Sequence, residues 1–131
     1  MTTHVTGTIE TKTWGEQPYD EIEGLPKLTR GSMTESFHGD IEGDATVETV
    51  MVYRDDGSAS FVGLQRVIGR IGDRSGSFVL QASGTFEGGT GKCAWLVVPG
   101  SGTGDLRGLQ GEGGYVWDGQ TTRLTLDYDF E

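Results

Sequence analysis

The sequence of 131 residues contains a single cysteine, Cys93. An intrachain disulfide is therefore excluded, a reduced compartment is expected, and the thiol, in an apolar strand, is interpreted as buried and inert. The first ten residues, "MTTHVTGTIE", lack the basic and apolar regions of a secretory signal. No apolar run approaches the roughly 20 residues that cross a bilayer. These absences predict a cytoplasmic protein that does not enter a membrane.

Positive charge is also scarce. Ten Lys and Arg residues stand against 20 Asp and Glu residues, and the net charge is -10. Such a chain repels nucleic acid and anionic membranes, so neither is an expected partner. Two histidines, His4 and His38, are interpreted as exposed polar residues, with a two-histidine metal site as the alternative. No group of residues has the spacing of metal ligands, and no cofactor is predicted.

Helical periodicity is missing as well. The chain has 23 glycines spread along its length, and each glycine inside a helix costs about 1 kcal/mol relative to alanine. The longest stretch without glycine, residues 44–56, reads "DATVETVMVYRDD". Its β-branched residues and its alternation of polar and apolar residues are typical of a strand. The whole sequence therefore favours an all-β fold.

Turn signals divide the chain into strands. Asp56-Gly57, Gly88-Gly89 and Asp118-Gly119 are dipeptides that suit tight hairpins. Between such turns we predict eight strands, at about 3–14, 28–39, 44–54, 59–70, 77–87, 92–98, 108–117 and 121–130. The segment 15–27 contains two prolines and is predicted to be a loop over one end. Short links between successive strands predict one domain over 1–131, a closed eight-stranded antiparallel meander β-barrel.

The glycine-rich stretch 97–114, "VVPGSGTGDLRGLQGEGG", invites comparison with phosphate-binding loops. No lysine follows the glycines at the spacing of a P-loop, and Arg107 occupies the third glycine position of the GxGxxG fingerprint. Both motifs also need a following helix, whereas a strand is predicted here. We interpret the glycines as bends of a closing barrel and residues 99–105 as an ordered rim.

Three segments carry a family resemblance: "WLVVPGSGTGDLRGLQGEGG" (95–114), "IGDRSGSFVLQASGTF" (71–86) and "FHGDIEGDA" (37–45). Together they resemble a bacterial family of unknown function with the allene oxide cyclase-like barrel. The resemblance implies an eight-stranded barrel with a central, largely apolar cavity, and relatives that cyclise reactive apolar metabolites. Many members of that family have a histidine where this chain has Ala82, so imidazole chemistry at that position is excluded here.

The parity of each strand predicts which residues face the lumen. In 44–54 and 59–70 the odd positions are the inward ones, and in 121–130 the even positions are. The inward set is aromatic and aliphatic with isolated polar groups, which is the usual makeup of a small-molecule pocket. The alternative is a lumen filled by side chains, with tyrosine hydroxyls reaching water. The predicted ligand-binding residues are Phe37, Met51, Tyr53, Gln65 and Tyr128.

One candidate catalytic residue follows from the same reasoning. In the strand "LTRGSMTESFHG", the odd face carries Met33, Glu35 and Phe37, and the even face carries Ser, Thr and His. If the apolar odd face points inward, Glu35 lies in the lumen, where burial would raise its pKa. An inward arginine would instead hold it ionised. A one-residue bulge would turn the Ser/Thr face inward and leave Glu35 in solvent.

Several functions are compatible with these residues. The first is a cyclase or isomerase of a reactive apolar metabolite, which would hold its substrate in a reactive shape. The second is a non-catalytic carrier or sensor of such a molecule, and the third is a structural barrel without a cavity. The expected partner is a small apolar molecule in the first two cases.

Apolar residues also occur on predicted outward faces, among them Val50, Val52, Val62, Leu64 and Ile68. Such a patch is unusual on the surface of a monomer. A homodimer is one hypothesis, and packing of the patch under the segment 15–27 is the other.

Overall fold

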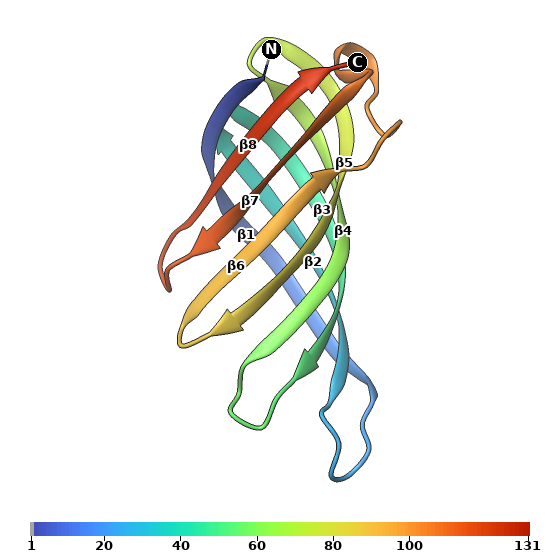
Figure 1. The fold of residues 1–131 in the computed structure, drawn as a ribbon, viewed down its shortest axis with the longest axis vertical. Coiled ribbons are helices and arrows are strands. Elements are labelled where there is room, and N and C mark those ends of the chain that lie inside the picture. The colour runs from blue at the N-terminus through green and yellow to red at the C-terminus, as the bar shows by residue number, and fades with distance from the viewer. Residues whose placement is uncertain (1) are drawn as a thin grey trace.

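The computed structural model describes residues 2–131, which form one closed barrel (Figure 1). Each strand pairs antiparallel with the next, and β8 returns to pair with β1. This confirms the predicted eight-stranded meander. The strands are β1 Thr3–Asp20, β2 Leu28–Gly39, β3 Ile41–Tyr53, β4 Ala59–Ile71, β5 Arg74–Glu87, β6 Thr90–Val97, β7 Leu109–Trp117 and β8 Thr122–Phe130.

The only helix among the described residues is the three-residue 3-10 turn η1, Gly104–Leu106. Nothing in this part of the chain therefore has the helical length that a membrane crossing requires. The remaining strand ends differ little from expectation, since β3 begins at Ile41 and β5 at Arg74. Both extensions arise because the turns before these strands are tighter than predicted.

The predicted loop over 15–27 is wrong for its first half. Strand β1 continues to Asp20, and only 21–27 connects it to β2. Pro18 is tolerated because β8 pairs with β1 only along Thr3–Ile9, so the later part of β1 is an edge that needs no second hydrogen-bonded neighbour. The β1–β2 and β3–β4 hairpins therefore project beyond the other two at one end of the barrel, here called the hairpin end (Figure 1).

A bulge in β1 changes which of its side chains face inward. Thr11 pairs with Glu35 and Thr13 with Thr34, so Lys12 is an extra residue. Before the bulge the odd residues Val5 and Ile9 are in the core. After it the even residues take over the inner face, since each extra residue reverses the alternation of a strand.

Apolar side chains fill the barrel at the end opposite the hairpin end, here called the closed end. The residues at this end and in the middle of the lumen are exposed by no more than 2%: Phe37, Ile41, Ile71, Phe78, Leu80, Leu106, Leu124 and Leu126. Burial of side chains of this size stabilises the fold by roughly 1.5–3 kcal/mol each. This packing leaves the hairpin end as the place where the lumen can open.

The glycine-rich rim is part of this closure. Thr103 donates its backbone N–H to the carbonyl of Ser77, and its hydroxyl accepts the N–H of Ser77. Gly76 permits the approach, since a Cβ there would lie 2.0 Å from the Thr103 carbonyl oxygen. The segment leads into η1, whose Leu106 is fully buried. These contacts agree with the interpretation of 99–105 as an ordered rim.

The outer face of β3 and β4 carries exposed apolar side chains. Val50 and Val62 pair across the two strands and are 40% and 54% exposed, and Leu64 and Ile68 are also exposed. Packing of this patch under residues 15–27 is therefore wrong, because these side chains stay exposed although Tyr19 borders Val50 and Val62. The homodimer stays a prediction.

Glycine at one inward position lets β5 and β6 come close together. A Cβ at Gly84 would lie 2.0 Å from the carbonyl oxygen of Lys92 and 2.6 Å from the ring of Phe61. At Gly15, by contrast, the nearest atom to an added Cβ is 4.0 Å away, and the backbone is ordinary.

We expect Gly84→Ala to lower the free energy of unfolding by about 1–3 kcal/mol, because the added methyl group overpacks the barrel wall. Gly15→Ala is the matched control and should change it by less than about 0.5 kcal/mol. Urea unfolding of the three proteins measures both effects. Equal midpoints for Gly84→Ala and Gly15→Ala would contradict this account of the close strand approach.

Candidate ligand-binding site

The inner surface near the hairpin end forms a recess, which we call the lumen recess. It lies in the lumen of the barrel and is lined by residues from six of the strands. Its lining is largely apolar and aromatic, with a few polar groups: Trp14, Met33, Glu35, Val47, Thr49, Met51, Phe61, Gly63, Gln65, Ala82, Phe86 and Tyr115.

The lumen recess opens toward the hairpin end and is blocked toward the closed end. Trp14 at its mouth is 49% exposed, although it lies on the inner face of β1, whereas Phe37 deeper in the lumen is 1% exposed. The space that water-sized molecules could occupy is about 30 Å³. That is room for about two water molecules. The free space in the lumen recess is therefore small, and it lies toward the hairpin end.

Glu35 and Gln65 form the polar centre of the lumen recess. Glu35 on β2 and Gln65 on β4 are 8% and 2% exposed, and the Gln65 amide Nε2 donates a hydrogen bond to Glu35 Oε1. The two residues reach across β3, where Ala45 pairs with Glu35 and Val47 pairs with Gln65. These smaller side chains of the intervening strand leave space for the contact.

Burial raises the pKa of Glu35 to about 7, and the hydrogen bond from Gln65 opposes the shift without cancelling it. Among residues 2–131, no ion pair involves this carboxyl. The same burial raises the pKa of the Cys93 thiol to about 12 and raises that of the half-buried Tyr115, with a smaller contribution from the negative charge of Glu35 in both. Cys93 is thus buried and protonated at neutral pH, as predicted.

The predicted odd face of β2 does point inward. Glu35, Met51 and Gln65 line the lumen recess together. Phe37 faces the lumen one layer deeper, where it stacks on Trp95 with ring centroids 5.8 Å apart, and it does not line the recess. The indole Nε1 of Trp95 is buried in that layer without a hydrogen-bond partner among the described residues.

Tyr53 lies farther out, at the mouth of the barrel. Its hydroxyl donates a hydrogen bond of 2.5 Å to Glu16 Oε2, which also accepts a bond of 2.6 Å from the Thr29 hydroxyl. Partial burial, with the neighbouring carboxylate of Glu16, raises the pKa of Tyr53 to about 12. The Lys27 ammonium lies 5.2 Å from the centroid of the Tyr53 ring. This group forms a polar rim beside the lumen recess.

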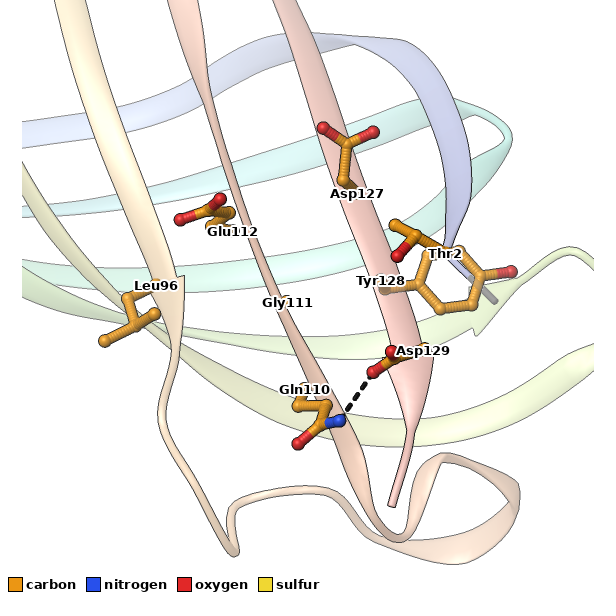
Figure 2. Close-up of a pocket in the computed structure, with 8 residues that line it drawn as sticks. All are labelled: Thr2, Leu96, Gln110, Gly111, Glu112, Asp127, Tyr128 and Asp129. Carbon is orange, nitrogen blue, oxygen red and sulfur yellow. Dashed lines mark hydrogen bonds between the residues drawn. The ribbon is translucent and has the colours of Figure 1, made fainter.

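Tyr128 does not join the other predicted ligand-binding residues. It packs edge-on against Phe130 and borders a shallow groove over β6, β7 and β8, near the N-terminus (Figure 2). Figure 2 also shows Gln110 donating to Asp129 across that groove, over 2.6 Å. Tyr128 was predicted to bind a ligand in the lumen, and it does not line the lumen recess. Tyr128 is at an inward-facing position of β8, but it lies near the end of that strand that is farther from the lumen recess.

Two residues of the site escaped the sequence analysis because of the β1 bulge. Trp14 pairs with Met33, and Glu16 pairs with Gly31, so both face inward. Trp14 ends the predicted strand 3–14 just past the bulge, Glu16 falls in the predicted loop over 15–27, and no residue type in β1 marks the bulge. Tyr115 was also missed, since the glycines around it on β7 obscure the alternation.

The histidines take no part in the site. His4 contacts Asp127 over 2.5 Å, His38 lies 3.8 Å from Glu42, and both histidines are exposed, as predicted. Within residues 2–131, no group of three or more His, Cys, Asp or Glu side chains could hold a metal ion.

Comparison with known proteins places the chain in a family. Residues 5–128 match the family described as "Protein of unknown function (DUF3224)". A crystal structure of a DUF3224 protein of unknown function from Shewanella oneidensis MR-1 is similar, with 29% sequence identity and a TM-score of 0.87. The similarity covers 100% of this chain and 99% of that one. No curated protein matches the sequence.

The raised pKa of Glu35 predicts a pH-dependent stability. Below about pH 4.5 the carboxyl is protonated in both the folded and unfolded chain, and burial carries no ionisation penalty. Between about 4.5 and 7 the unfolded chain ionises first, so the free energy of unfolding falls as pH rises. Above pH 7 the full penalty is present, about 3 kcal/mol for a shift of this size.

Glu35→Gln should therefore be more stable than the natural protein by an amount that grows between pH 4.5 and pH 8, by up to about 3 kcal/mol. The exposed Glu10→Gln serves as the control and should show no such growth. Chemical unfolding at both pH values measures the difference. An identical difference at the two pH values would mean that Glu35 titrates as an exposed carboxyl does.

Proposed function

The chain belongs to the DUF3224 family, and we propose that it binds a small, largely apolar molecule in the lumen recess. The observation that carries the proposal is the Glu35–Gln65 pair, buried at the bottom of an apolar recess that opens at one end of a closed barrel. Ligand pockets typically combine an apolar lining with a few convergent polar groups. A polar pair with only a structural purpose would not need an open mouth.

The small free volume sets a condition on binding. About 30 Å³ cannot hold an organic molecule, so a ligand must displace side chains at the mouth. Met33 and Met51 are unbranched and flexible, and Trp14 is half exposed, so these side chains are the ones best able to rearrange, with Met51 the more costly to move because it is buried. The filled layer around Phe37 limits how deep a ligand can go. The proposed ligand is accordingly small and enters from the hairpin end.

A second candidate is catalysis of an isomerisation or cyclisation on the bound molecule. The specific observation is that the Glu35 carboxyl has a pKa of about 7 and faces the free space. A carboxyl with that pKa can give a proton to one atom of a substrate and take one back from another, without a cofactor. The resemblance to allene oxide cyclase-like barrels supports this candidate. A carrier or sensor would use the same recess without turnover.

Filling the lumen recess tests the proposal. Ala82 lines the recess on β5, whereas Ala94 lies on the outer face of β6 and is exposed. We expect the natural protein and Ala94→Leu to retain a small molecule from a bacterial extract in native mass spectrometry, and Ala82→Leu to lose it. Conversion of that molecule by the natural protein, but not by Glu35→Gln, would favour catalysis over carriage. A molecule retained equally by both leucine variants would contradict binding in the recess.

A further inference from the structure

The distribution of charge inside the barrel is one-sided. All ten lysine and arginine side chains are exposed, and none lines the lumen recess. The recess does contain a buried carboxyl group, that of Glu35. A carboxylate in such a place is costly unless a positive charge lies beside it, and the protein supplies none.

Side chains from three strands act on the Glu35 carboxyl. Gln65 on β4 donates its hydrogen bond, and Tyr115 on β7 and Cys93 on β6 are the titratable neighbours. The last two stay protonated and uncharged at neutral pH, because burial raises the pKa of both. No side chain around Glu35 can therefore act as its counter-ion.

Aromatic rings surround the same free space. Trp14, Phe61, Phe86 and Tyr115 all line the lumen recess, and the rings of Phe61 and Phe86 stack with centroids 5.2 Å apart. The face of an aromatic ring attracts a cation, most strongly where water is excluded. Aromatic faces together with one carboxylate form an environment that suits an organic ammonium ion.

We infer that the ligand of the lumen recess is a small organic amine, bound as its ammonium ion against the Glu35 carboxylate with its apolar body among the aromatic rings. The inference rests on the proposed binding function and narrows the class of ligand. A carboxylate or phosphate ligand would meet a like charge and no base. A neutral alcohol would gain a hydrogen bond only, which is the weaker interaction.

Negative charge is also present at the mouth of the lumen recess. Glu16 lies on the inner face at the mouth, where it accepts hydrogen bonds from Tyr53 and Thr29. The Lys27 ammonium is exposed, and it lies over the outer Tyr53 ring rather than beside Glu35. The net charge of -10 adds a negative field around the whole molecule. Such a field raises the rate at which cations arrive and slows anions.

Three test ligands of one shape separate the alternatives: 2-phenylethylamine, 2-phenylethanol and phenylacetate. Isothermal titration calorimetry at pH 8, where Glu35 is ionised, gives their affinities. We expect the amine to bind about tenfold more tightly than the alcohol, since a charged hydrogen bond replaces a neutral one. Phenylacetate should bind most weakly. At pH 5.5 the advantage of the amine should shrink, because its binding must then expel the Glu35 proton.

Two substitutions locate the effect. Glu35→Gln should cut amine affinity about tenfold and leave alcohol affinity nearly unchanged. Glu10→Gln removes the same charge from the outer surface and should alter neither affinity. Phenylacetate or the alcohol binding as tightly as the amine would overturn the inference and leave the binding function standing. If none of the three binds at millimolar concentration, the inference and the proposed binding of small apolar molecules both fail.

Discussion

A buried carboxyl group without a counter-ion is the constraint on which the rest of this site depends. Glu35 is held in an apolar lumen by one hydrogen bond from Gln65, and no basic side chain lies beside it. Burial therefore raises its pKa to about 7, so that the folded protein holds a proton that the unfolded chain releases. A stable barrel must supply enough apolar burial elsewhere to offset this cost.

The fold supplies that burial at one end and an opening at the other. The closed end is packed with side chains around Phe37 and sealed by Leu106 and the glycine-rich rim. At the hairpin end, β1 extends beyond the last residue that pairs with β8. The bulge at Lys12 turns Trp14 inward. The open end and its partly exposed aromatic lining thus follow from the unequal lengths of the strands. The position of Glu35 between the two regions gives it both burial and access to free space.

Much of this architecture could be predicted from the sequence, since alternation along a strand fixes which side chains face inward. Glu35, Met51 and Gln65 were placed in the lumen by parity alone, and the structure puts them together. Parity cannot report how far along the barrel a residue lies, which is why Tyr128 was grouped with them. It also fails at a bulge, because one extra residue reverses the alternation without any distinctive residue type. Trp14 and Glu16 were missed for that reason, and the free volume depends on packing that no periodicity reports.

The protonation of Glu35 in the free protein can be measured directly. The side-chain carboxyl carbon of Glu35, assigned by comparison with Glu35→Gln, can be followed by 13C NMR from pH 4 to pH 9. The account predicts a titration midpoint near pH 7 for Glu35. A midpoint near 4.5, the ordinary value for glutamate, would show that the carboxyl is solvated or paired and would contradict the account.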